Sequence, residues 1–468
     1  MEENSRSNPL IQSLSNATFW TGLFAACYLA VLPMASTIAL RNVALLGLLI
    51  GLGWHFSRIR SNFRLGMPVM LWALYLIAFP LFSDDHSTAW QSLGGQWGRG
   101  LLAMLAGVGV ASILSNKNRG LAFYLGLISS LPILVHLILF IVKAWTTSSI
   151  PWGYWGRETH HADLGYAAGQ AVILLAAAIA AGPKVLRPWS AALIVACLLS
   201  TALANSRAGF AFCVLGGVSV FAAAYLTRTT HRRINFLVGA LGVIVVGTAV
   251  LAVAIQEDAR WKTMTPELVA GFHGDAIQLQ CEGTASIEPL IIANHGDQAQ
   301  RIINSVQYGD GSRVVVFRAG LALALKHPWG SDGSRQAFQK MLRQECANPS
   351  ITMAHTHDGW LDTILALGWG GASLYLFVLL NFFRQGYLCL RSENGLSEWA
   401  LVLVALSTFW MVRGLTDSVL RDHMLEMQGF VLSFALTIMQ RQKRKSLMRD
   451  PTGVLTDVPY AIASRRPR

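Results

Sequence analysis

The stretch HDGWLDTILALGWGGASLYLFVLLNFF, residues 357–383, decides the class of fold. From Gly359 onward it is an apolar run of the length that a helix needs to cross a hydrocarbon core, which takes roughly 20 residues. Its titratable side chains gather at the start, where His357, Asp358 and Asp362 lie. The stretch therefore predicts a membrane-spanning helix with polar groups at its mouth.

The composition extends this prediction to the whole chain. The 468 residues are 53% hydrophobic and 13% charged, whereas soluble domains carry about a quarter charged residues. We therefore expect an all-α polytopic membrane protein with about twelve transmembrane helices. The expected spans lie near residues 19–40, 42–56, 67–82, 100–114, 120–145, 165–182, 190–205, 209–227, 234–255, 359–383, 398–413 and 427–440.

The lysines and arginines of the short loops predict the orientation. One side of the bundle carries Arg58, Arg60, Arg64, Lys117, Arg119, Lys184, Arg187, Arg228, Arg232, Arg233, Arg384, Arg391 and the basic tail 441–468. The other side carries fewer, namely Arg41, Arg99, Lys143, Arg157, Arg207, Arg413 and Arg421. Because positive loops stay on the cytoplasmic side, both termini are expected in the cytoplasm. Orientation also accounts for the net charge of +12 without a nucleic-acid partner.

The polar segment 256–357 then forms a large loop on the outer side, between the ninth and tenth spans. Asp310 and Ser312 are typical start residues for a helix that ends before Pro328, and a second helix is expected from Ser334. The loop is therefore expected to be a folded cap rather than a tether.

The cap belongs to a single transmembrane domain, residues 1–468. Cys281 and Cys346 both fall in the cap, and a disulfide between them is possible if it faces an oxidising compartment. The sequence leaves their bonding open.

Arg207, in the segment SRAG at 206–209, lies in the short turn that joins two predicted spans. Its small neighbours leave the guanidinium room to reach a ligand. A planar fork of five donors is suited to bidentate phosphate binding. The alternative is an interfacial arginine that extends to the lipid headgroups.

Arg313 and Arg318 lie on the first helix expected in the cap. Arg313 is favoured as the phosphate ligand because it is at the helix N-terminus, where backbone amides also attract anions. Solvated surface charge is the alternative for both residues.

His357 lies at the N-terminal end of the tenth span, where the helix dipole disfavours a protonated imidazole. A neutral imidazole at the membrane face can accept a proton, as general base catalysis requires. A capping or structural histidine is the alternative. His355 is expected to support His357 rather than to react.

Two weaker candidates are Asp417 and Arg157. Asp417 is expected either to orient His357 or to pair with Arg413, and a surface ion pair or a helix cap is an equally good interpretation. Arg157 begins the segment RETHHAD, whose adjacent histidines do not share one face of a helix as a metal site requires. No metal is therefore expected, and the sequence has no P-loop or dinucleotide-binding fingerprint that would indicate a cofactor.

Three short motifs occur in order along the chain, namely SRAG at 206–209, SR at 312–313 continuing to FRAGLALALKHPWG at 317–330, and His357 followed by Gly368 and Gly371. Together with the twelve-helix layout and its large outer loop, they resemble the O-antigen ligase/polymerase family of bacterial envelope glycosyltransferases. Two positions depart from the family pattern. Asp358 stands where the family often has an amide or hydroxyl residue, and Gly330-Ser331-Asp332 stands where a Gly-x-Gly is usual, with Gly333 one place late.

The resemblance implies glycosyl transfer without a metal or nucleotide at the periplasmic face of the inner membrane. The donor would be a glycan on undecaprenyl diphosphate and the acceptor a lipid A core sugar. His357 would be the base, and Arg207, Arg313 and Arg318 would bind the diphosphate. Membrane lipids are the other expected partners.

Two further activities of the family stay open, namely polymerisation of O-antigen units and oligosaccharide transfer to proteins. Ligation is favoured because the folded cap and the single histidine signature resemble ligases. A polytopic transporter or flippase is the alternative from another class. Transporters place their substrate groups near the bilayer midplane, whereas the polar candidates here gather at one face.

Overall fold

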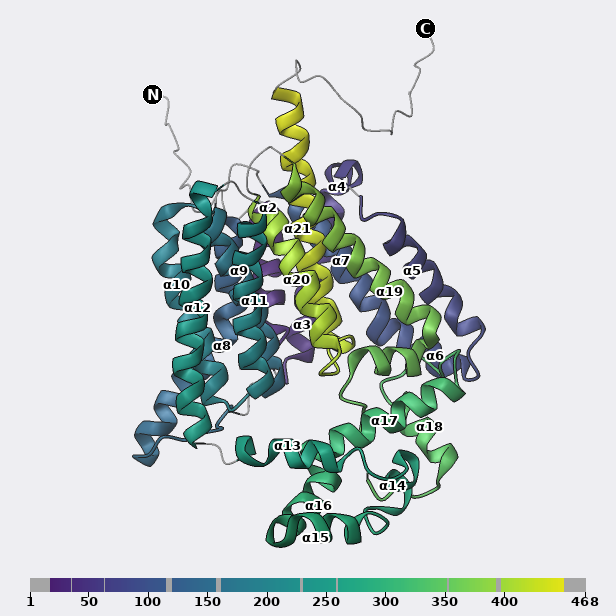
Figure 1. Cartoon of the computed structure of the whole chain (residues 1–468). Helices are drawn as coiled ribbons and strands as arrows, with labels where there is room; N and C mark the ends of the chain where they lie inside the picture. Colours follow the sequence, from purple (N-terminus) through teal and green to yellow (C-terminus); the bar gives the residue numbers. More distant parts are fainter. Residues whose placement is uncertain are drawn as a thin grey trace, which may run out of the picture.

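The computed structural model describes residues 17–34, 36–62, 64–114, 120–156, 161–227, 230–257, 260–351, 353–392 and 397–449. The elements of these residues are helices, arranged as a bundle with a separate group of shorter helices at one end (Figure 1). The expectation of an all-α polytopic membrane protein is confirmed.

The bundle consists of the apolar helices. Six helical segments of the described residues are long and apolar enough to cross a membrane, namely Leu121–Thr147, Ala162–Ala181, Lys184–Leu203, Arg207–Leu226, Arg233–Val253 and Gly359–Arg391. Each of the other expected spans also falls on a helix, but twelve crossings stay a prediction.

The bundle helices are α2 (Ala17–Val31), α3 (Ile38–Trp54), α5 (Met67–Ala78), α7 (Gly98–Ile113), α8 (Leu121–Thr147), α9 (His161–Ala181), α10 (Arg187–Leu203), α11 (Arg207–Leu226), α12 (Thr230–Glu257), α19 (Gly359–Arg391), α20 (Glu398–Gly414) and α21 (Asp422–Arg449).

The first expected span, 19–40, is wrong in its boundaries. Helix α2 ends at Val31 and α3 begins at Ile38. Pro33 has no N–H for a helical hydrogen bond, and the Thr37 hydroxyl donates to the carbonyls of Val31 and Met34 at 2.9 and 2.7 Å. The chain therefore turns between two shorter helices.

Small residues bring the bundle helices close together where the site begins. A Cβ added to Gly209 of α11 would lie 2.8 Å from the Cα of Gly165 in α9. This close approach, typical of packed membrane helices, fixes the start of α11 and therefore the position of Arg207.

Helices α13–α18 form the cap, which lies at one end of the bundle (Figure 1). The two helices expected in the cap are present. The second begins at Ala337 rather than at Ser334. The Asp332 carboxylate accepts the Ser334 N–H at 3.0 Å and holds a turn before the helix. The cap helices are α13 (Arg260–Ala270), α14 (Ala276–Glu282), α15 (Glu288–His295), α16 (Ala299–Tyr308), α17 (Asp310–Lys326) and α18 (Ala337–Glu345). The remaining short helices are α4 (Phe56–Asn62), α6 (His86–Ser92), η1 (Phe79–Leu81), η2 (Leu93–Trp97), η3 (Lys184–Leu186) and η4 (Gly296–Gln298).

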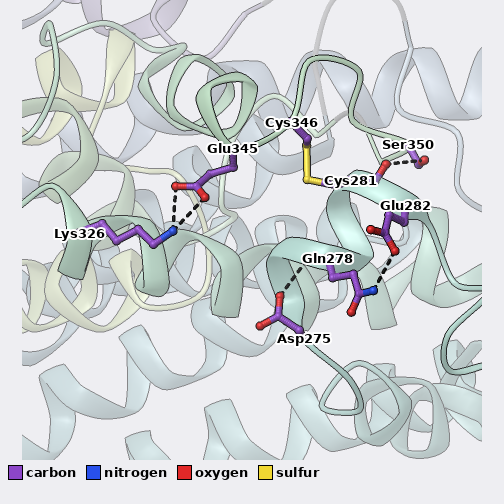
Figure 2. Close-up of a disulfide and its surroundings, with 8 residues drawn as sticks. All are labelled: Asp275, Gln278, Cys281, Glu282, Lys326, Glu345, Cys346 and Ser350. Carbon is purple, nitrogen blue, oxygen red and sulfur yellow. Dashed lines mark hydrogen bonds and ion pairs between the residues drawn. A yellow bond between two sulfur atoms is a disulfide. The ribbon is translucent and has the colours of Figure 1, made fainter.

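A disulfide joins the two halves of the cap. Cys281 of α14 is bonded to Cys346, which directly follows α18 (Figure 2). The Ser350 hydroxyl donates to the Cys281 carbonyl at 2.9 Å, and the Lys326 ammonium pairs with the Glu345 carboxylate at 2.8 Å nearby. These links tie α14, α17 and α18 into one unit.

The cap rests on a kink in α19. Gly368 has φ 72° and ψ 173°, so the expected span 359–383 consists of two helical pieces. The Trp369 N–H donates to the Pro328 carbonyl at 3.0 Å, and a Cβ on Gly368 would lie 2.6 Å from the Trp329 carbonyl carbon. Glycine is needed here for both its positive φ and its close backbone approach.

The loop after Pro328, where the sequence departs from the family pattern, also depends on glycine. Gly330 and Gly333 both have positive φ, 80° and 70°. The N–H groups of Ser331 and Gly333 donate to the Ala366 carbonyl, at 3.3 and 3.0 Å. Gly333, which stands one place later than in the family pattern, therefore provides a second positive-φ residue in the turn that packs against α19.

Candidate active site

A cavity of about 780 Å³ lies where α11, α16, α17 and the segment before α19 meet. We call it the histidine cavity. It brings together three residues that the sequence predicts as functional, although they are far apart in the chain. Its lining residues are Arg207, Glu267, Arg301, Asn304, Ser305, Tyr308, Gly309, Asp310, Arg313, Met353 and His357.

Arg207 is the first residue of α11 and connects the bundle to the cap. Its Nη2 lies 2.7 Å from Oδ2 of Asp310, the first residue of α17, and both side chains are largely buried. Its Nη1 also contacts the Met264 sulfur at 3.7 Å. A phosphate entering this cavity would compete with the Asp310 carboxylate for the same guanidinium.

Arg313 follows Asp310 by three residues, and its side chain is exposed to the cavity. No hydrogen bond or ion pair joins it to another residue of the described part of the chain. Arg313 is therefore available to bind an anion.

Arg301 adds a third guanidinium, which the sequence analysis missed. Its Nε lies 3.6 Å from Oε1 of Glu267, and its side chain is 48% exposed. Glu267 is buried and also accepts a hydrogen bond from the Ser305 hydroxyl at 2.6 Å. With Glu267 and Asp310 as the acidic lining residues, three arginines leave the cavity positively charged.

Arg318 is not among the residues that line the histidine cavity. Its guanidinium donates to the carbonyls of Gly271, His273 and Gly274, at 3.1, 3.4 and 2.7 Å. These carbonyls follow the end of α13, so the contacts fix that helix end against α17. Arg318 therefore has a structural role here, and its expected contact with the diphosphate stays an untested prediction.

His357 lies two residues before α19 and has a left-handed backbone, with φ 57°. Its ring centroid is 4.2 Å from that of His355. Burial lowers the pKa of His357 to about 4, and the nearby His355 and Arg313 act in the same direction. The imidazole is therefore neutral at pH 7, although the causes differ from the helix dipole that the sequence suggested.

His355 is held by a short polar network. The Ser418 hydroxyl lies 2.8 Å from Nδ1 of His355 and donates to Oδ2 of Asp362 at 2.5 Å. The other oxygen of Asp362 accepts the Thr356 N–H at 2.9 Å. The network connects the loop after α20 with the start of α19 and fixes the ring against which His357 packs.

Asp358 directly follows His357 and starts α19. Its carboxylate accepts the Leu361 N–H at 2.7 Å, as an N-cap residue does. Burial raises the pKa of Asp358 to about 6. The acid that departs from the family pattern therefore has a helix-capping role.

Asp417 forms an ion pair with Arg413, at 3.0 Å. Arg413 is almost completely buried and lies over the rings of Tyr166 and Phe212, at 5.0 and 4.8 Å. Burial acts to raise the pKa of Asp417, but the charge of Arg413, together with the hydrogen bonds from Tyr166 and the Ser418 N–H, outweighs burial and the pKa is lowered. The carboxylate is therefore ionised, and its charge favours the protonated form of the nearby His357.

Several site residues were missed because they are ordinary cap or loop residues in the sequence. Asp310 was interpreted only as a helix start, and Arg301 and Ser418 have no local signal. The excess of arginine over acid in 301–318 was the one available clue. Arg157 lies outside the described residues, and within the described part no group of His, Cys, Asp and Glu could hold a metal ion.

The fold and the cavity define a class of protein. This is a polytopic helical membrane protein in which a disulfide-linked helical cap closes a cationic, histidine-containing cavity at one end of the bundle. Residues 191–376 match the family model described as O-antigen ligase. The match runs from α10 through the cap to the kinked α19 and includes Arg207, Arg313 and His357.

The match confirms the resemblance to this family over the segment 191–376. This family implies glycosyl transfer in the processing of O-antigen, with a lipid-linked glycan donor. No match was found among curated proteins.

Proposed function

We propose that this protein is an O-antigen ligase of the bacterial inner membrane. It transfers O-antigen polysaccharide from undecaprenyl diphosphate to a lipid A core sugar, and thereby completes lipopolysaccharide. The observation that carries the proposal is that a neutral histidine and a set of arginines line one cavity.

Arg207 and Arg313, with Arg301 beside them, bind the diphosphate of the donor. The diphosphate gains negative charge as its bond to the sugar breaks, and guanidinium groups stabilise that charge. Arg313 is free to bind, and Arg207 exchanges the Asp310 carboxylate for a phosphate oxygen.

His357 is the general base. The acceptor hydroxyl oxygen forms a bond to the anomeric carbon, its proton moves to the His357 imidazole, and the bonding electrons leave with the diphosphate. A base of low pKa is weak, but the negative charge of a bound diphosphate raises the pKa of the imidazole toward neutrality. Attack from the face opposite the leaving group inverts the anomeric centre.

The cavity faces the periplasm in this proposal, and both termini are cytoplasmic. The cap disulfide supports this orientation, because disulfides persist in the periplasm and are rare in the cytoplasm. The chain, residues 1–468, acts as one transmembrane domain with about twelve spans, the periplasmic loop 256–357 and the cytoplasmic tail 441–468.

Complementation in a ligase-deficient Gram-negative strain tests the activity. Cells with the wild-type protein are expected to show polysaccharide-capped lipopolysaccharide on gels, and cells with Arg207→Ala to show uncapped core with retained lipid-linked polymer. In a second strain, which keeps its own ligase but lacks a polymerase, a change from single-unit to long-chain capping on expression of the wild-type protein would instead indicate a polymerase. Glycan attached to protein would indicate a protein oligosaccharyltransferase.

A further inference from the structure

A second cavity, of about 530 Å³, lies between the starts of α3 and α21, the helices α6 and η2, and the turn before α18. We call it the Arg41 cavity. The function proposed above does not use it, yet it contains two of the outer arginines predicted from the loops. Its lining residues are Ile38, Arg41, Thr88, Gln91, Ser92, Gly95, Gln96, Arg99, Ser334, Arg335, Gln336, Asp422, His423 and Glu426.

Arg41 is a buried cation without a partner in this cavity. Its side chain lies in the first turn of α3, and the residue is only 8% exposed. The Nε atom is buried with no hydrogen-bond partner, and no ion pair joins Arg41 to another residue that the structure describes. A buried charge left without hydrogen bonds is costly, so an anion bound beside it would be stabilising.

The other charged groups of the Arg41 cavity already have partners. Arg99 binds both carboxylate oxygens of Glu426, at 2.9 and 3.2 Å, and Tyr28 also donates to that carboxylate. Glu426 attracts Arg41 electrostatically, but its hydrogen bonds go to these other residues. A ligand with its own negative charge would therefore meet Arg41 without having to displace an existing ion pair.

Arg335 and His423 are also paired across the cavity. Arg335 lies 3.5 Å from Asp422, and His423 lies 3.5 Å from Asp163 of α9. These pairs join the turn before α18 and the start of α9 to the start of α21, so they form the walls of the cavity.

The Arg41 cavity lies close to the histidine network. Arg335 and Ser334, which line the cavity, also line a small hollow with Asp362. Asp362 accepts the Ser418 hydroxyl that holds His355. The Arg41 cavity is therefore linked through this hollow to the network that holds His355, whereas the histidine cavity is lined by His357 itself.

The mouth of the Arg41 cavity is apolar on the side of α3. Ile38 lines the cavity and is 62% exposed, and Val43, Leu46 and Ile50 continue an exposed apolar face along the helix. A ligand with acyl chains along this face and an anionic group at Arg41 would match both features.

We propose that the Arg41 cavity binds a phosphate group of the acceptor glycolipid. The inference rests on the proposed function, because it assigns the acceptor side of the same reaction. Arg41 holds the phosphate through its guanidinium, the start of α3 adds its helix dipole, and the acyl chains lie against α3 in the membrane.

Binding to the purified full-length protein in detergent tests the proposal without a transfer reaction. The probes are phosphorylated lipid A, its dephosphorylated counterpart, phosphatidylglycerol and inorganic phosphate. Wild-type protein is expected to bind phosphorylated lipid A about tenfold more tightly than the dephosphorylated lipid, as one charge-assisted pair allows. Arg41→Gln should remove that preference, and Arg41→Lys should keep part of it.

Two other variants serve as controls. Arg343→Gln removes the same charge from the exposed face of α18, away from both cavities, and should bind as the wild type does. Arg207→Gln should weaken binding of the lipid diphosphate donor while it keeps the phosphate preference. Elution volume and melting temperature identify a variant that fails to fold, in which case Arg41→Lys decides the test.

The proposal is overturned if folded Arg41→Gln or Arg41→Lys binds phosphorylated lipid A with the full wild-type preference. Equal Arg41-dependent binding of phosphatidylglycerol or inorganic phosphate would also overturn it, because the ligand would then be a bulk lipid headgroup or free phosphate. Failure of the proposed function is distinguishable: the wild type would then transfer no glycan while Arg41-dependent binding persists.

Discussion

At the level of single residues, the proposed transfer reaction depends on the protonation of His357. The sequence predicted a neutral imidazole from the position of His357 at the N-terminal end of a predicted span, where the helix dipole disfavours the protonated form. It did not predict the causes, because burial and the proximity of His355 and Arg313 arise only in the folded chain. These causes determine how activity should change with pH.

The profile of kcat/KM against pH should show an acid limb near pH 4. A histidine with a lowered pKa stays neutral from pH 8 down through 6.5, and it becomes protonated only as the pH falls through about 4. Arg313→Gln should move this limb to higher pH, because Arg313 lowers the pKa. The limb of kcat itself should lie at higher pH, since it reports the complex with bound diphosphate.

Steady-state rates measured between pH 3.5 and 9 give both limbs. As a stability control, the protein is returned to pH 7 after each measurement and assayed again. An acid limb of kcat/KM at pH 6.5 that Arg313→Gln leaves in place would argue against His357 as the base.

Arg207 and Arg318 should respond differently to substitution, although the sequence grouped them as diphosphate ligands. Arg207→Ala is expected to lower kcat at least about 100-fold, the loss seen when one donor to a transition-state anion is removed. Arg318→Ala removes hydrogen bonds to three carbonyls and should lower stability by about 1–3 kcal/mol with kcat largely retained. Thermal melting and transfer rates on the same preparations compare the two, and the reverse pattern would contradict these roles.

At the scale of elements, the kink in α19 joins the cap to the membrane bundle. The helix itself was predictable from its apolar run, and the glycines 368 and 371 were known as a motif. The sequence did not predict that Gly368 forms a kink. The turn at 328–330 that contacts Gly368 belongs to the cap and lies nearly forty residues earlier in the chain.

Gly368→Ala should destabilise the protein by roughly 1–3 kcal/mol, the cost of a strained backbone at a non-glycine residue. The added Cβ would also lie 2.6 Å from the Trp329 carbonyl carbon. Gly370→Ala is the matched control in the same helix, because its Cβ would meet only the Tyr75 side chain, at 3.3 Å. Melting temperatures that are equal in the two variants would show that the kink does not require glycine.

The cap disulfide gives a second prediction at this scale. The bond closes a loop with a sequence separation of 65 residues, and the chain-entropy estimate for such a loop is about 4 kcal/mol. Reduction should therefore lower the melting temperature of the wild-type protein, whereas the Cys281→Ser/Cys346→Ser variant should melt at the lower temperature with or without reductant. A wild-type melting temperature unaffected by complete reduction, verified by thiol labelling, would contradict a stabilising bond.

At the scale of the whole molecule, the architecture follows from composition, but the site does not. Apolar runs predict helices, and proline and polar breaks predict most of their ends. The histidine cavity needs α11, α16, α17 and the start of α19 to meet, which depends on tertiary contacts such as Arg207 with Asp310. Residues such as Arg301 and Ser418 join the site through those contacts alone, so local sequence could not identify them.

In the proposed function, His357 and the arginines of the histidine cavity carry out one transfer reaction. The most direct test is transfer by purified protein from lipid-linked O-antigen to lipid A core, without nucleotide and in the presence of a metal chelator. We expect product with the wild type and a rate lower by about 100-fold or more with folded His357→Ala, while lipid diphosphate binding persists in that variant. Transfer at the wild-type rate by His357→Ala would show that His357 is not the base of this reaction.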